Sequence, residues 1–309
     1  MSPHRGQSTD CTVGCGRKPR RAWYADPGAR AGLDSAARRC HNPPVAQSVK
    51  RCLHDWAWLP AMVLMCVAGP CLRGADWPQW RGPDRDGVWR ETGIVETFAR
   101  PELKPRWIAA VGPGYSGPTV AGDRVFLTDR VTAPEQQERV LCFDRVSGRP
   151  LWTHAYRCVY QDVDYALGPR AAVTVADGRA FSLGTMGHAH CLDVQDGKVI
   201  WSRNLAAELQ ASINVWGISS APLVAGERVF VMGVDRVVSA YDAIDGRLLW
   251  VLQRPGEALT LSQPGVVAAF NDTLLIGQGH RLTGVDPLRG SVRWEVALAN
   301  PRGTNEVER

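Results

Sequence analysis

The stretch Cys191-Leu-Asp-Val-Gln-Asp-Gly197-Lys-Val-Ile-Trp201 is one of four copies of the pattern that decides the fold. Each copy has a small residue, an Asp two positions later, a Gly four positions after the Asp and a Trp four positions after the Gly. The other copies begin at Cys142, Ala240 and Gly284 and end at Trp152, Trp250 and Trp294. The tryptophans are 49, 49 and 44 residues apart. A repeat of this length, built from short alternating strands, is typical of propeller blades and not of helical solenoids.

Each recurring position of the pattern has a physical explanation. An Asp followed four residues later by Gly predicts a hairpin turn, because the Asp side chain bonds its own backbone and Gly accepts a positive φ. The Trp ends the following strand, where its flat ring can cover the joint between neighbouring blades. The small residue ten positions before each Trp is expected to lie beneath a Trp ring of a neighbouring blade. The turn positions are Asp144, Asp193, Asp242 and Asp286, followed by Gly148, Gly197, Gly246 and Gly290.

A second pair of strand-like runs precedes each copy. The runs cover 118–127, 172–181, 221–230 and 265–274, and each holds a turn of Gly, Asp, Glu or Asn between apolar and β-branched residues. Each repeat therefore supplies four strands, which make one propeller blade. The sequence predicts an all-β fold, a β-propeller whose four-stranded blades span about 114–156, 169–205, 217–254 and 262–298.

The pattern resembles the tryptophan-docking repeat of pyrroloquinoline quinone (PQQ) dehydrogenases, which is also the repeat of the non-catalytic outer-membrane assembly lipoprotein BamB. From Pro105 onward the order of segments looks most like the BamB-type group, and Trp107 stands in the place of its leading strand. The stretch 77–83 resembles the mature N-terminus of secreted bacterial members. The resemblance covers about 76–309 and implies an eight-bladed ring, of which the repeats at 105–309 supply about four blades after an extended segment at 76–104. Half a ring would leave blade edges open, so we expect self-association through them.

The first 75 residues differ in composition from the repeats. Residues 1–48 are rich in Arg, Pro, Gly, Ser and Cys without periodicity, which indicates a disordered leader or a start assigned too early. Residues 49–75 begin with Lys50 and Arg51, continue with an apolar run and end in small residues, as a secretory signal peptide does. We therefore expect export to the periplasm or cell envelope, cleavage near Gly74 or Ala75, and no membrane span afterwards. A retained N-terminal anchor is the alternative.

The basic charge of the chain belongs mostly to this leading part. Of the 36 basic and 31 acidic residues, 11 and 4 precede Asp76. The remaining 25 basic and 27 acidic residues give the rest of the chain a formal net charge of −2. This balance does not favour a nucleic-acid partner.

The cysteines and histidines of the repeats offer little chemistry. Cys142 and Cys191 occupy the same small position in successive blades, where packing explains them, and Cys158 has no assigned partner. His188 and His190 are two apart on an expected strand, so their side chains share one face and are the candidates for a metal site. The sequence attaches no carboxylate to this pair, and we expect no metal there.

A PQQ-dependent dehydrogenase is the catalytic alternative. For such enzymes the resemblance implies a quinone held by Ca²⁺, an Asp base and, in many members, a vicinal pair of cysteines. The sequence has no Cys-Cys dipeptide and no Cys-x-x-Cys-His haem site, and the turn explains each repeat Asp. We therefore predict no bound cofactor and no dehydrogenase activity with added PQQ and Ca²⁺.

The favoured function is a secreted, non-catalytic scaffold or binding propeller with protein partners in the cell envelope. Binding of a glycan or a small ligand is a further alternative. In such propellers the innermost strands line a central channel, and their first residues form one of its mouths. Aligning the inner strands on their valines places Tyr115, Arg170 and Ser219 at these starts, with Trp216 nearby. These four residues are the predicted contact surface, unless they fill and hydrogen-bond the neck of the channel.

Overall fold

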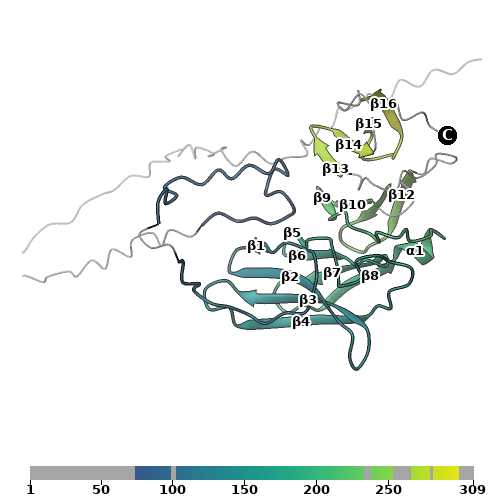
Figure 1. Cartoon of the computed structure of the whole chain (residues 1–309). Helices are drawn as coiled ribbons and strands as arrows, with labels where there is room; N and C mark the ends of the chain where they lie inside the picture. Colours follow the sequence, from purple (N-terminus) through teal and green to yellow (C-terminus); the bar gives the residue numbers. More distant parts are fainter. Residues whose placement is uncertain (1–73, 99–101, 233–237, 253–265, 279–280, 299–309) are drawn as a thin grey trace, which may run out of the picture. The chain divides into compact units, whose positions relative to one another are not determined.

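The computed structural model describes residues 74–98, 102–232, 238–252, 266–278 and 281–298 (Figure 1). The expected leader at 1–48 and all but the last two residues of the expected signal segment at 49–75 lie outside this range. The regular secondary structure of the described residues is almost entirely β-strand. Among the described residues the one helix, α1 (Leu205–Glu208), has four residues and is far too short to cross a membrane.

The described strands form four antiparallel sheets of four strands, and in each sheet the strands follow one another in chain order. Blade 1 holds β1 (Thr119–Ala121), β2 (Arg124–Val131), β3 (Gln137–Asp144) and β4 (Pro150–Arg157). Blade 2 holds β5 (Thr174–Ala176), β6 (Arg179–Leu183), β7 (His188–Asp193) and β8 (Val199–Asn204). Blade 3 holds β9 (Leu223–Ala225), β10 (Arg228–Met232), β11 (Val238–Asp242) and β12 (Leu248–Leu252). Blade 4 holds β13 (Val266–Phe270), β14 (Thr273–Gln278), β15 (Arg281–Val285) and β16 (Val292–Ala297). The all-β fold of four-stranded propeller blades is as the sequence predicts.

The repeat pattern forms the hairpin between the third and fourth strands of every blade. In blade 1, Oδ1 of Asp144 accepts the backbone N–H of Val146 at 3.1 Å and that of Ser147 at 2.7 Å. The N–H of Gly148 donates to the carbonyl oxygen of Asp144 at 2.8 Å, with φ 71° at Gly148. The turn recurs at Asp193, Asp242 and Asp286, with φ between 71° and 73° at Gly197, Gly246 and Gly290. A side-chain acceptor and a left-handed glycine thus fix the same turn four times.

The small residue of the pattern lies opposite the Trp of its own blade. The cross-strand pairs are Cys142 with Trp152, Cys191 with Trp201, Ala240 with Trp250 and Gly284 with Trp294, each followed by a β-bulge. The expectation that a Trp from a neighbouring blade covers this residue is wrong. Directly opposed residues on one face of a sheet are only about 4.5–5.5 Å apart, so a large ring needs a small residue across from it.

The neighbouring blade meets the Trp at the turn glycine instead. A Cβ at Gly246 of blade 3 would lie 2.6 Å from the ring of Trp201 of blade 2, which only glycine permits. The indole N–H of Trp201 donates to the carbonyl oxygen of Ala243 in the same turn at 3.2 Å. Trp107, Trp152 and Trp250 dock in the same way on the turns of Gly148, Gly197 and Gly290. One ring stack and one hydrogen bond therefore join each blade to the next.

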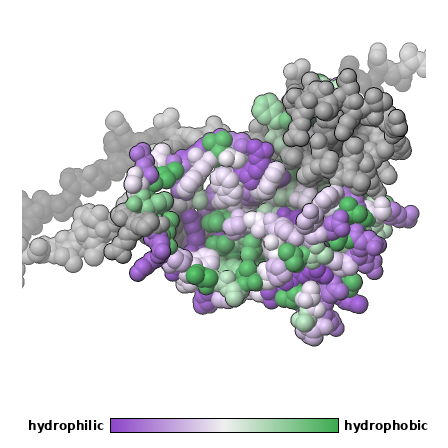
Figure 2. Space-filling model, in the orientation of Figure 1, coloured by the Kyte–Doolittle hydropathy of each residue, from purple (hydrophilic) through white to green (hydrophobic). Residues whose placement is uncertain are grey.

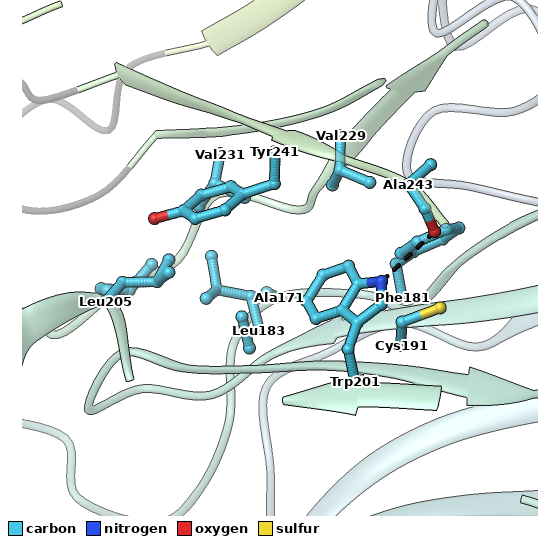
Figure 3. Packing of buried hydrophobic residues seen from close by; sticks show 12 residues of the cluster. Ala171, Phe181, Leu183, Cys191, Trp201, Leu205, Val229, Val231, Tyr241 and Ala243 are labelled. Carbon is cyan, nitrogen blue, oxygen red and sulfur yellow. Dashed lines mark hydrogen bonds between the residues drawn. The ribbon is translucent and has the colours of Figure 1, made fainter. Parts of the chain in front are cut away.

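Apolar side chains fill the junction between blades 2 and 3 (Figure 3). Leu183 of β6 packs with Val231 of β10 and Tyr241 of β11, and all three are almost fully buried. Trp201 belongs to the same cluster and is 8% exposed. Burying such large side chains is the main favourable contribution to blade docking.

Candidate functional site

The three residues that the sequence aligned at the strand starts all lie four positions before those strands. β1, β5 and β9 begin four residues after Tyr115, Arg170 and Ser219. Their placement is therefore corrected from the inner strands to the segments that lead into them. Connecting segments carry contact residues more often than strands do, because their side chains are not committed to the sheet.

Arg170 is held beside Tyr115 by backbone oxygens. Its Nη2 donates to the carbonyl oxygens of Asp164 at 2.6 Å and Tyr165 at 3.0 Å. The guanidinium carbon lies 5.3 Å from the centroid of the Tyr115 ring, within the range of a cation–π contact. The N–H of Tyr115 donates to the carbonyl oxygen of Pro169 at 2.8 Å, which ties the two segments together.

Trp216 joins the same group through a residue that the sequence reasoning missed. The Tyr165 and Trp216 rings are stacked, with centroids 5.5 Å apart and planes 16° apart. The N–H of Asp164 donates to the carbonyl oxygen of Val215 at 2.7 Å, which fixes the two segments beneath the rings. Tyr165 lies in the connection between β4 and β5, outside the recurring small residue, Asp, Gly and Trp of the pattern. Its sequence signal was that it is an aromatic residue in a long connection between two expected strands.

We call Tyr115, Tyr165, Arg170 and Trp216 the aromatic surface. Tyr165 is 65% exposed and Tyr115 44% exposed, so both rings reach solvent. Ser219 is half-buried. On the face that Figure 2 draws, hydrophobic patches lie between hydrophilic ones. Hydropathy alone therefore does not mark out the aromatic surface, which is recognised by the contacts among its residues.

A buried carboxylate lies between blades 1 and 2. Glu138 of β3 is fully buried, and it accepts the phenolic O–H of Tyr156 at 2.6 Å, that of Tyr160, and the N–H of Thr185 at 3.1 Å. A Cβ at Gly184 would lie 2.2 Å from Oε2 of Glu138, so the blade 2 turn needs glycine there. Burial, together with the nearby carboxylate, raises the pKa of Tyr156 well above its ordinary value, so this phenol remains a donor. Three donors satisfy the carboxylate, as a buried charge requires.

Histidines pack against this carboxylate network. His188 and His190 share one face of β7, with ring centroids 5.4 Å and 4.2 Å from that of Tyr156, and His154 lies 4.8 Å from His190. Burial lowers the pKa of all three, that of His190 to about 3, with the neighbouring histidines adding to the effect there. Across the described residues no group of three or more His, Cys, Asp or Glu is arranged to hold a metal.

Packing and turns account for the cysteines and the repeat aspartates of the described residues. The cysteines in this part of the chain, Cys142, Cys158 and Cys191, are separate, buried and free of disulfides. Burial raises the pKa of Cys142 and of Cys191 to about 12, so both remain thiols near neutral pH. Each repeat Asp binds the backbone of its own turn, which leaves no repeat carboxylate placed as a base.

Comparison with known proteins places these features in a family. The family model described as outer membrane protein assembly factor BamB matches residues 136–309. No curated protein sequence matches the chain. BamB from Moraxella catarrhalis, a solved structure, is 17% identical with a TM-score of 0.44, over 58% of this chain and 50% of its own. A europium-containing methanol dehydrogenase is 18% identical with a TM-score of 0.46, over 61% and 42%. The quinohemoprotein alcohol dehydrogenase from Comamonas testosteroni is 16% identical with a TM-score of 0.49, over 72% and 41%.

The chain spans half or less of the length of these solved proteins. The stretch that the family model matches contains all four copies of the repeat pattern, from Cys142 to Trp294. The match is to the BamB-type model, whereas the similar structures include both BamB and quinoprotein dehydrogenases. The chain belongs to the BamB family of PQQ-like repeat propellers.

Proposed function

We propose that the chain is a non-catalytic scaffold of the cell envelope that binds a protein partner through its aromatic surface. The BamB-type family match supports the class of function, because BamB is named as an assembly factor and not as an enzyme. The aromatic surface is the observation that carries the proposal for this chain.

The composition of the aromatic surface suits a protein partner. Tyr, Trp and Arg are the residue types that contribute most to the binding energy of protein interfaces. Here the three aromatic rings are exposed and Arg170 is half-buried. Two carbonyl oxygens fix Arg170, and Trp216 is stacked on Tyr165. A surface that is already ordered loses little conformational entropy when a partner binds.

Site-specific photo-crosslinking tests this surface in cells. A photoreactive phenylalanine at Trp216 is expected to give one discrete adduct in the envelope fraction. The matched control is the same replacement at Ile244, which is 54% exposed on the blade 3 turn, and should give no such adduct. Equal adducts at both positions would contradict the proposal.

Alanine variants then measure the contribution of the rings. With the crosslinked partner purified, Tyr165→Ala and Trp216→Ala should each weaken binding about tenfold or more, as central aromatic contacts do. Ile244→Ala should leave the affinity unchanged. Unchanged affinity in both aromatic variants would assign the interface to another surface.

The alternative function is that of a PQQ-dependent oxidoreductase. We consider it because the similar structures include a methanol dehydrogenase and an alcohol dehydrogenase. We expect no saturable change in protein fluorescence when PQQ and Ca²⁺ are added, and no dye reduction with alcohols or sugars. Turnover above the level of a heat-denatured sample would overturn the non-catalytic proposal.

Export is part of the same proposal. Lys50 and Arg51, the apolar run after them and the small residues up to Ala75 support a cleaved signal segment. N-terminal sequencing of the protein from the envelope fraction should find a first residue near Ala75 or Asp76. A cytoplasmic product that begins at Met1 would be the contrary result.

A further inference from the structure

The first strands of blades 1, 2 and 3 lie side by side, and each is an edge strand of its own sheet. β1 contacts β5, and β5 contacts β9. The hydroxyl of Thr119 donates to the carbonyl oxygen of Val173, and that of Thr174 to the carbonyl oxygen of Pro222, each at 2.6 Å. Each of these strands is the edge of its sheet, so the outward N–H and C=O groups have no partner within the sheet and another segment can pair with them.

One continuous stretch of the chain, residues 76–87, supplies partners to all three blades. We call it the strap. In blade 1, Trp77 and Val120 exchange two backbone hydrogen bonds, of 2.8 and 3.0 Å. In blade 2, the N–H of Val175 donates to the carbonyl oxygen of Pro78 at 2.8 Å. The strap therefore continues along the inner edges by backbone pairing, in the way that an added strand does.

The third contact of the strap is made by an arginine side chain. Arg85 is 9% exposed, and its Nη1 donates to the carbonyl oxygen of Pro222 at 3.0 Å. Its Nη2 donates to that of Ala221 at 3.3 Å. These two carbonyl oxygens lie just before β9 in blade 3. A planar guanidinium with several donors can bind two adjacent carbonyl oxygens, which an ammonium does less well.

The strap has its own compact turn, which positions Arg85. The Trp77 ring lies against Gly82, where a Cβ would be 2.9 Å from it, and Gly82 has φ 82°. The side-chain oxygen of Gln79 accepts from Nη1 of Arg85 at 3.2 Å, and its amide donates to the carbonyl oxygen of Pro83 at 2.7 Å. Arg81 instead donates to the carbonyl oxygen of Asp86 within the strap. Of the two arginines, Arg85 is thus the one that reaches the blades.

We propose that the inner edges of the first three blades form a binding site for an extended, arginine-bearing peptide, and that the strap occupies this site in cis. The peptide is recognised by backbone hydrogen bonds at Val120 and Val175, and its guanidinium donates hydrogen bonds to the carbonyl oxygens of Ala221 and Pro222. The site is separate from the aromatic surface, so it goes beyond the proposed function. A peptide of the same chemistry binds when the strap is released.

The test uses the full chain and a fluorescent synthetic peptide with the sequence of residues 76–87. The chain variant Arg85→Ala weakens the strap in cis. We expect saturable peptide binding to this variant, measured by anisotropy, and binding at least tenfold weaker to the wild-type chain, whose site is occupied.

Two altered peptides provide the matched pair. A peptide with the Arg85→Ala change should bind the variant chain at least tenfold more weakly than the unaltered peptide. A peptide with Arg81→Ala should bind like the unaltered one. Equal binding of both altered peptides, or no saturable binding of any peptide to the variant chain, would overturn the proposal.

Hydrogen exchange keeps the proposal testable if the variant is unstable. In the wild-type chain the amides of Val120 and Val175 should exchange slowly, and Arg85→Ala should accelerate the exchange of Val175 while β6 stays protected. Equal exchange of Val175 in the two chains would show that the strap does not hold this edge. Loss of protection throughout blade 2 would indicate that the variant unfolds, and the comparison is then repeated with Arg85→Lys. For this variant we expect a smaller acceleration of exchange, confined to the amide of Val175. An exchange rate of Val175 equal to that of the wild type would contradict the proposed binding of the guanidinium by the two carbonyl oxygens.

Discussion

Blades 2 and 4 end in the same motif and differ in what surrounds it. Trp201 of β8 is 8% exposed, stacked on Gly246 of blade 3 and bonded to Ala243. Trp294 of β16 is 40% exposed, and within the described residues its ring lies against Gly284 of its own blade. Both rings pair with a small residue across the hairpin. The motif therefore builds the hairpin, whereas the neighbouring turn buries the ring.

A second difference lies between the two junctions of blade 2. The junction with blade 3 is filled by Leu183, Val231 and Tyr241. The junction with blade 1 contains the fully buried Glu138 with Tyr156. Phe126, Val140 and Leu192 belong to an apolar cluster at this junction as well. Blade 2 is thus joined by apolar packing on both sides, and a polar network is added on the blade 1 side. Four predictions separate these contributions.

The largest effect is expected at the apolar junction. Trp201→Ala should lower the free energy of unfolding by about 3–5 kcal/mol, because it empties a buried aromatic site. The measurement is urea unfolding followed by circular dichroism at constant pH. A variant as stable as the wild type would refute the docking account of the blade junction.

A smaller loss is expected at the polar junction. Glu138→Gln keeps the shape but replaces a carboxylate that accepts from two phenols and a backbone N–H. We expect a loss of about 1.5–3 kcal/mol, the range for hydrogen bonds to a charged group. Glu135→Gln, at an exposed position before β3, is the matched control and should change stability little. Equal effects at the two positions would contradict a structural role for the buried carboxylate.

The histidines make the polar junction sensitive to acid. The folded-state pKa of His190 is lowered to about 3, mainly by burial, whereas an unfolded histidine titrates near 6.5. Between these values the unfolded chain binds more protons, so stability is full above about pH 6.5 and falls as the pH is lowered towards 3. His154 and His188 shift in the same direction.

Urea midpoints at pH 7.5 and pH 5 measure this dependence. His190→Leu should reduce the difference between the two midpoints, because one of the groups that take up protons on unfolding is removed. An unchanged difference would assign the acid sensitivity to other groups.

The smallest effect is expected at Trp294. Trp294→Ala removes a ring that is 40% exposed and lies against Gly284 of its own blade, so the loss should be about 1 kcal/mol or less. The same exposed face, with Val292 and Val296, is proposed to mediate self-association. Light scattering of the full chain should then show a smaller mass for Trp294→Ala than for the wild type. A loss of stability as large as that of Trp201→Ala would mean that the two rings are equally buried.

The sequence by itself determined the repeat and its local chemistry. The spacing of Asp, Gly and Trp predicted four blades and the turn that closes each outer hairpin, because these features depend on residues close together in the chain. It also placed His188 and His190 on one face, since a strand alternates its side chains. The sequence reasoning misassigned the residue of the next blade that lies beneath each docking Trp. The pattern has two small positions, its first residue and the turn glycine, and it does not say which of them contacts the Trp of the neighbouring blade.

Tertiary structure alone decided burial and assembly of the sites. Tyr165 lies in a connection outside the repeat, and only the folded chain stacks it on Trp216. Glu138 stands at an ordinary strand position, and its role appears only when Thr185 of the next blade donates to it. Arg85 reaches the carbonyl oxygen of Pro222, which is 137 residues later in the chain. Contacts over such separations depend on how blades dock, which a local pattern of residues does not encode.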